Sequence, residues 1–153
     1  MLKPGRGDAG NRETSVMDPT ALHSRAYEWT GGRIGHRLGG GVRAALLTTT
    51  GRKTGRSRTV PVVYTRDGAE YVFVASNNGR DRPPAWLLNA TAKPEVQLQI
   101  GPAHLLGTAR VVPPDDPDYT RLWQLANDGN HGRYQRYQAK TSRPIALLVV
   151  TPA

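Results

Sequence analysis

The chain has 153 residues, a net charge of +9 and no cysteine. This length suits one domain, and the missing cysteines exclude disulfides and thiolate metal sites. The positive charge indicates anionic partners, such as nucleic acid, a phosphorylated cofactor or an acidic membrane surface.

Neither a signal peptide nor a membrane span is expected. Residues 1–20 lack an apolar core, and the longest apolar run, residues 145–150, is too short to cross a bilayer. We therefore expect a soluble, cytoplasmic protein with a loose tail over residues 1–20 and one domain over residues 21–153. A peripheral membrane contact through the N-terminal segment is left open, as is the oligomeric state.

The first half of the domain changes from short helices to strands. Residues 21–29 follow Asp18-Pro19, a helix start signal, and residues 33–38 form a basic helical turn. Three consecutive glycines, residues 39–41, then interrupt the chain. Strands are predicted at residues 43–50, 59–66 and 70–76, because these segments are rich in β-branched and apolar residues.

The second half mixes strands and short helices. A proline opens a predicted helix over residues 84–90, with Trp86 and Leu87 on its inner side. Strands are predicted at residues 95–100, 104–112 and 145–150, and helices at residues 119–127 and 133–139. About six strands with short flanking helices predict an α+β fold in which a small antiparallel barrel removes its edges by closing.

A cluster of cations lies between the first two predicted strands. Four cations occur within residues 51–58, and no Asp or Glu occurs between Glu28 and Asp67. A bound polyanion would offset the repulsion among them, and Gly51 and Gly55 would let backbone N–H groups approach it. The turn is interpreted as a phosphate clamp, with a solvated hairpin loop as the alternative. A Walker loop is excluded because its glycine and lysine spacing is absent.

Other candidate sites carry less information. The four histidines are scattered without metal-ligand spacing, so no metal site is expected. The aspartates within residues 115–118 precede a predicted helix, where capping explains them better than acid–base catalysis. Tyr134 and Tyr137 share one face of a predicted helix, and spacing alone favours packing over two phenols in a cleft. Trp86 is likewise a core residue on this evidence alone.

Five motifs in order along the chain resemble the deazaflavin-dependent nitroreductase family. They are Thr48-Thr49-Thr50-Gly51-Arg52-Lys53-Thr54-Gly55 with Arg58, then Ala75-Ser76, then Pro84-Ala85-Trp86 with Leu88-Asn89, then Pro94 with Val96 and Leu98, then Tyr134-Gln135 with Tyr137-Gln138. The resemblance extends from about Thr30 to Val150. It implies a split β-barrel of the flavin and deazaflavin oxidoreductase superfamily that uses coenzyme F420, an 8-hydroxy-5-deazaflavin.

The resemblance also implies roles for individual residues. Arg52, Lys53 and Arg58 would bind the phosphate and acidic tail of the coenzyme. Tyr134 and Tyr137 resemble the C-terminal tyrosines that face the substrate, and they are the candidate catalytic residues. The remaining cofactor-binding positions implied by the motifs are Thr50, Pro61, Ala75, Ser76, Asn77 and Trp86, of which Ser76 and Trp86 would line the ring pocket.

Three positions differ from the best-known members of that family. Asn77 replaces a lysine, Val63 replaces a tyrosine two residues after Pro61, and His131 lies where an aromatic residue is usual. The acceptor pocket is therefore expected to differ, and reduction of nitro compounds does not follow from the resemblance.

The main hypothesis is a reductase that transfers a hydride from reduced F420 to a small acceptor: a quinone, an activated alkene or a nitro compound. A phenol is protonated at neutral pH, so Tyr137 could donate to that acceptor. The alternatives are a nucleic-acid-binding β-barrel, suggested by the charge and the interleaved Arg and Tyr, and the same barrel binding FMN. Nucleic acid is not expected as a partner, because it does not explain the ordered motifs.

Overall fold

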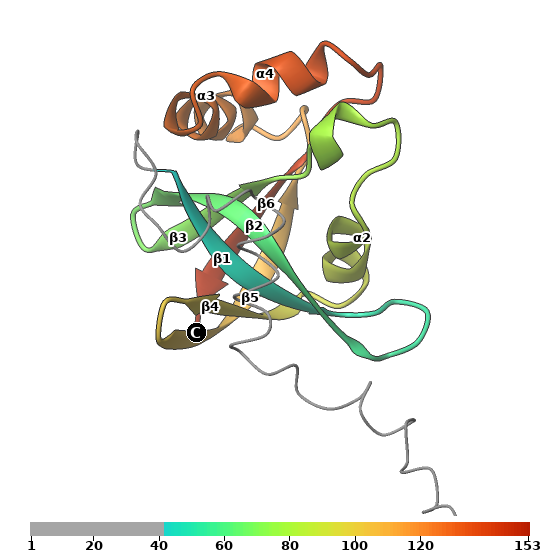
Figure 1. Cartoon of the computed structure of the whole chain (residues 1–153), viewed down its shortest axis with the longest axis vertical. Helices are drawn as coiled ribbons and strands as arrows, with labels where there is room; N and C mark the ends of the chain where they lie inside the picture. The colour runs from blue at the N-terminus through green and yellow to red at the C-terminus, as the bar shows by residue number, and fades with distance from the viewer. Residues whose placement is uncertain (1–41) are drawn as a thin grey trace, which may run out of the picture.

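The computed structural model describes residues 42–153, which form a closed barrel flanked by short helices (Figure 1). The strands lie in the order β1-β2-β3-β6-β5-β4, with antiparallel neighbours and β4 paired back onto β1. The elements are β1 Arg43–Thr50, β2 Ser57–Asp67, β3 Glu70–Val74, the 3₁₀ turn η2 Asn77–Gly79, α2 Ala85–Ala92, β4 Glu95–Ile100, β5 Ala103–Val112, α3 Tyr119–Gly129, α4 Arg133–Gln138 and β6 Leu147–Pro152. The predicted six-stranded split barrel of the α+β class is confirmed. The predicted tail over residues 1–20 and the helices over 21–29 and 33–38 lie outside the described residues.

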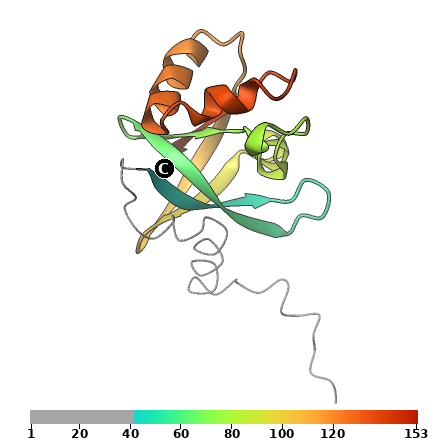
Figure 2. The same cartoon turned by 45° about the horizontal axis from the view of Figure 1, so that its top comes forward.

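The hairpin of β1 and β2 carries the basic turn. Its register pairs Arg43 with Tyr64 at one end and Thr50 with Ser57 at the other. Alternation along β1 places Ala45 and Leu47 in the barrel core. The turn end of the hairpin projects away from the barrel in both views (Figures 1 and 2). The cations are thus displayed on a rigid arm of the sheet.

The barrel wall is buried on both faces where α3 and α4 cover it. Inside, Phe73, Leu98 and Leu148 belong to one apolar cluster. Outside, Val149 of β6 packs with Leu122 of α3 in a second cluster. This double burial explains why the final strand is apolar at consecutive positions, as the sequence predicts. None of the helices within residues 42–153 is long and apolar enough to cross a membrane.

β6 begins two residues later than the sequence predicts. The N–H of Ile145 donates to Gln138 Oε1 at 2.9 Å, and its carbonyl accepts from the Tyr119 hydroxyl at 2.5 Å. These side-chain partners replace sheet hydrogen bonds, so the ladder starts at Leu147, which pairs with Val74 and Val112. Ile145 is still fully buried.

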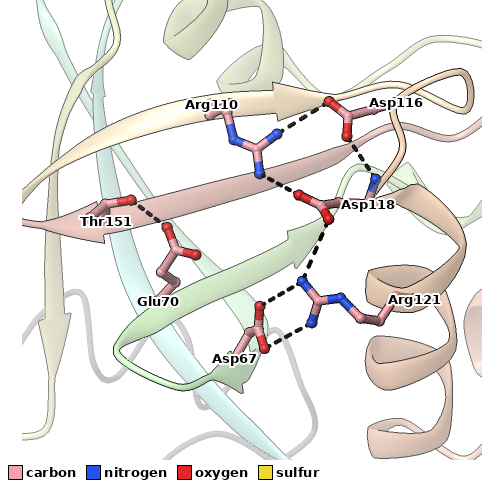
Figure 3. Close-up of polar contacts among 7 residues, drawn as sticks. All are labelled: Asp67, Glu70, Arg110, Asp116, Asp118, Arg121 and Thr151. Atoms are coloured by element: carbon pink, nitrogen blue, oxygen red, sulfur yellow. Dashed lines mark hydrogen bonds and ion pairs between the residues drawn. The ribbon is translucent and has the colours of Figure 1, made fainter.

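The aspartates before α3 form ion pairs on the outside of the barrel (Figure 3). Arg110 lies 3.2 Å from Asp116 and 3.4 Å from Asp118, while Arg121 lies 3.0 Å from Asp67. Asp118 is the N-cap residue but makes no side-chain capping bond; instead its N–H donates to Asp116 Oδ1 at 2.9 Å. Of the aspartates predicted to cap the helix, Asp116 therefore accepts a backbone N–H at the helix start, whereas Asp118 makes no capping bond because its carboxylate faces the two arginines.

Candidate active site

A cleft of about 1350 Å³ lies between the β1–β2 hairpin, the loop after β3, α2 and the start of α4. It gathers nine of the eleven site residues predicted from the motifs. These nine are Arg52, Lys53, Arg58, Pro61, Ser76, Asn77, Trp86, Tyr134 and Tyr137. Thr50 and Ala75 do not line it. Ala75 is fully buried in the barrel core, and Thr50 is the half-buried last residue of β1.

The basic turn is closed by its own backbone. The N–H of Gly51 donates to the Arg56 carbonyl at 2.7 Å, and the N–H of Gly55 donates to the Gly51 carbonyl at 2.8 Å. Gly55 adopts a left-handed conformation, with φ 72°. Gly51 has a different requirement, because a Cβ there would lie 2.8 Å from the Thr54 hydroxyl oxygen. Gly55 therefore supplies a positive φ, and Gly51 leaves room for the Thr54 side chain. Both N–H groups are already bonded within the turn, so the expectation that they approach a bound anion is wrong.

Asn89 of α2 anchors this turn, a role that the motifs do not reveal. Its side-chain oxygen accepts from the N–H of Arg52 at 3.1 Å, and its amide nitrogen donates to the Thr49 hydroxyl at 3.2 Å. Asn89 is buried, so these bonds are shielded from water. The helix thereby fixes the start of the turn relative to the cleft.

The cleft is strongly cationic. Among residues 42–153, no Asp or Glu lines it, and none of its Lys or Arg side chains makes an ion pair. Cations grouped without counter-charges create a positive potential that attracts anions. The sequence identified the three cations of the basic turn but not Arg43, Arg82 and Arg133, because these lie outside that turn in the chain. The six cations are Arg43, Arg52, Lys53, Arg58, Arg82 and Arg133.

The loop after β3 forms a second polar wall. Ser76 is in the right-handed helical region, while Asn77 and Asn78 have φ of 44° and 57°. A right-handed residue followed by a left-handed one is the backbone conformation of an anion-binding nest. The Asn77 amide nitrogen also donates to the Arg82 carbonyl at 2.8 Å. Backbone N–H groups of this loop can therefore supply hydrogen-bond donors to an anion.

Arg143 holds this loop in place from outside the cleft. Its guanidinium donates to the carbonyls of Ala75 at 3.2 Å, Ser76 at 3.2 Å and Arg80 at 2.9 Å. Burial lowers the pKa of Arg143, and the negative charge of Asp81 acts in the opposite direction. Three carbonyl partners compensate the desolvation, so Arg143 is a positioning residue for the loop.

The middle of the cleft is apolar. Val60, Pro61 and Val62 line it from β2, and Trp86 lines it from α2. Trp86 also packs edge-on against Phe73 of the core, with ring centroids 6.3 Å apart. Trp86 can therefore be both a core residue and part of the ring pocket, because one side of its ring contacts Phe73 and another side lines the cleft.

The two tyrosines of α4 both line the cleft but differ in burial. Tyr134 is 5% exposed and packs in the cluster beneath α3 and α4. Burial raises its pKa to about 12, with a hydrogen bond to Asn130 acting in the opposite direction. Tyr137 is half-buried, and Lys140 Nζ lies 5.5 Å from its ring centroid. Tyr137 is thus the more accessible of the two phenols.

Two of the positions that differ from the family pattern noted in the sequence also face the cleft. Val63 and His131 both line it, together with Asn130 and Tyr134. His131 occupies the left-handed region with φ 58°, at the corner between α3 and α4. The substitutions noted in the sequence therefore change the surface of the cleft itself.

The closed antiparallel barrel with short flanking helices has the split-barrel fold, and a cationic cleft with an apolar middle opens on one side of it. The profile of the family described as F420H(2)-dependent quinone reductase matches residues 20–152. The chain belongs to this family.

Individual relatives agree with this assignment. A Mycobacterium tuberculosis protein named F420H(2)-dependent quinone reductase is 48% identical over 130 residues, covering 85% of this chain and 87% of the relative. A solved structure described as an F420-H2 dependent reductase is 35% identical, with a TM-score of 0.61 over 70% of this chain and 92% of that chain. Another, described as a domain-swapped dimer, is 32% identical, with a TM-score of 0.62 over 87% and 99%. The resemblance found in the motifs is confirmed.

Proposed function

We propose that this chain transfers a hydride from reduced coenzyme F420 to a quinone. The observation that carries this proposal is the cleft itself: a cationic arm, lined by no carboxylate of residues 42–153, leads into an apolar middle bordered by two phenols. Ligand pockets usually measure about 300–1,000 Å³. The larger volume of about 1350 Å³ suits a coenzyme with a long acidic tail and an acceptor beside it.

The basic turn would hold the anionic part of the coenzyme. Arg52, Lys53 and Arg58 are exposed and line the cleft, and Asn89 fixes the backbone of the turn. Charge-assisted hydrogen bonds to phosphate and carboxylate groups are stronger than neutral ones. The tail would thereby be fixed, so that the ring enters the apolar middle.

The ring would lie between β2, α2 and the loop after β3. Pro61 and Trp86 supply apolar surface, and Ser76 with Asn77 supplies polar groups at the wall. When bound, the reduced deazaflavin supplies the hydride. The protein's contribution is to orient the ring and to keep water away from the reacting face.

Tyr137 would supply the proton. A quinone that accepts a hydride becomes a hydroquinone anion and needs one proton to become neutral. The half-buried phenol of Tyr137 lines the cleft and can hydrogen-bond to the acceptor oxygen while donating that proton. Tyr134 is more deeply buried and forms part of the cleft wall beside Tyr137. We expect the reaction to need no metal, so a chelator should leave turnover unchanged.

Equilibrium titrations test the coenzyme. Tryptophan quenching on adding F420, FMN or single-stranded DNA should show far tighter binding of F420, because its acidic tail can meet the cations of the basic turn whereas FMN has only its phosphate. Equal affinity for F420 and FMN would contradict the proposal, and tight DNA binding would favour a nucleic-acid-binding barrel. Nitro compounds and activated alkenes are further proposed acceptors. A cytoplasmic location also stays a prediction.

A further inference from the structure

The cleft has a second cationic end, for which the coenzyme's single acidic tail provides no partner. Arg43 at the start of β1 and His131 and Arg133 at the α3–α4 corner all line the cleft. Within residues 42–153, neither Arg43 nor Arg133 forms an ion pair. We call Arg43, His131 and Arg133 the far end.

Contacts between distant segments bring the far end together. Arg43 pairs with Tyr64 in the hairpin register, and the next residue of β2 is Thr65. A Cβ on Gly129, the last residue of α3, would lie 3.2 Å from the Thr65 hydroxyl oxygen. The end of α3, next to the α3–α4 corner, therefore packs on β2 one residue from Tyr64, the register partner of Arg43.

The corner is rigid. The N–H of Gly132 donates to the Asn127 carbonyl at 2.8 Å, and the N–H of Gln135 donates to Asn127 Oδ1 at 3.1 Å. Arg136 Nη1 donates to the His131 carbonyl at 3.1 Å, which holds His131 at its positive φ. His131 and Arg133 are thus presented to the cleft from a fixed backbone.

The far end is separated from the basic turn by the length of β1. The eight residues of this strand extend over roughly 23 Å at about 3.3 Å per residue. The lining between the two ends includes Val60, Val62 and Trp86, which carry no charge. An acidic tail held at the basic turn therefore leaves the charge of the far end without a partner among residues 42–153.

We propose that the far end binds an anionic group on the hydride acceptor, so that the preferred acceptors are quinones bearing a sulfonate or carboxylate. This inference rests on the proposed function, since it places the acceptor beside Tyr134 and Tyr137. Guanidinium groups suit oxyanions such as carboxylates and sulfonates, because two parallel N–H donors can bind two oxygens of the same group. Arg43 and Arg133 would then orient the quinone ring toward the coenzyme and raise its local concentration.

Steady-state kinetics with reduced F420 test the inference. We compare 1,4-naphthoquinone-2-sulfonate with neutral menadione in the wild type, Arg43→Ala, Arg133→Ala and Lys93→Ala. Lys93 is exposed and does not line the cleft, so its variant removes one charge elsewhere. The ratio of the two kcat/KM values should fall on the order of tenfold in the two arginine variants, through KM for the sulfonate. A wild-type ratio in both arginine variants would overturn the inference.

A binding measurement separates this inference from the proposed function. Naphthalene-2-sulfonate accepts no hydride, and calorimetry should show that Arg133→Ala weakens its binding while Lys53→Ala does not. If no quinone supports turnover but this pattern holds, the proposed function fails and the far end remains an anion site. Displacement of the probe by F420, together with its loss in Lys53→Ala, would place the anion at the basic turn and overturn the inference.

Discussion

The cations of the cleft and the cations beside α3 have opposite surroundings. Arg110 lies 3.2 Å from Asp116, and Arg121 lies 3.0 Å from Asp67, so each charge is paired on the protein surface (Figure 3). The cleft cations, such as Lys53, share a cavity that no carboxylate of residues 42–153 lines. Paired charges brace neighbouring elements, whereas grouped and uncompensated charges retain their attraction for a ligand. In this protein, the paired arginines beside α3 hold neighbouring elements together, whereas the unpaired cations of the cleft are available to bind an anion.

Two tyrosines show the same contrast. Tyr119 is half-buried on α3, and its hydroxyl donates to the Ile145 carbonyl at 2.5 Å. Burial raises the pKa of Tyr119. Tyr137 is half-buried on α4, and it lines the cleft. The Tyr119 phenol donates to a backbone carbonyl two residues before β6, while the Tyr137 phenol faces the space assigned to the acceptor.

The largest expected effect comes from removing the cleft phenol. Tyr137→Phe should lower kcat with quinones by about 100-fold or more, because general-acid roles are worth roughly 10²–10⁴-fold. Its Tm and F420 affinity should match the wild type. Tyr119→Phe, the matched control, should keep its turnover and lose about 1 kcal/mol of unfolding free energy with its hydrogen bond. Wild-type kcat for Tyr137→Phe on several acceptors would return Tyr137 to a packing role.

Tyr134 both lines the cleft and packs in the apolar cluster beneath α3, and the stability of the fold at alkaline pH should reveal the packing role. Its pKa of about 12 in the folded protein exceeds the ordinary value near 10, so the fold favours the neutral phenol. The resulting stabilisation is complete below about pH 10 and is lost between about pH 10 and 12, amounting to roughly 2–3 kcal/mol. Urea unfolding should show that the wild type loses this much more stability across the window than Tyr134→Phe. Parallel pH curves would contradict the assignment.

The basic turn should respond in affinity rather than stability. Arg52→Ala, Lys53→Ala and Arg58→Ala should each raise the Kd for F420 about ten- to a hundredfold, since a charged hydrogen bond contributes roughly 1.5–3 kcal/mol. Tm should not change, and added salt should weaken wild-type binding. Lys93→Ala should bind F420 normally. If all three turn variants also did so, the turn would be the solvated loop considered as the alternative.

The smallest effect is expected from removing one of the paired arginines beside α3. Arg121→Ala removes an exposed ion pair with Asp67, and such pairs contribute little. Tm should fall slightly at low salt and not at all at high salt, while F420 affinity and turnover stay at wild-type values. A marked loss of coenzyme affinity in this variant would show that the two charge groups are not separate.

The sequence by itself determined the strands, the hairpin and the position of the basic turn. Alternating or continuous apolar residues report burial directly, because side chains along a strand point to opposite faces. The four cations within residues 51–58 are neighbours in the chain, so their grouping needed no tertiary information. The motif series carried the cofactor hypothesis, although it also included Thr50 and Ala75, which do not line the cleft.

Only the tertiary structure decided how the cleft is held and where its second end lies. Asn89 is 37 positions from its partner Arg52, and Arg143 is 68 positions from Ala75. Arg43 and Arg133 meet the same cleft because barrel closure and the packing of α3 on β2 bring distant segments together. Local patterns report which face of an element is apolar, but contacts across such separations depend on the whole arrangement of strands and helices.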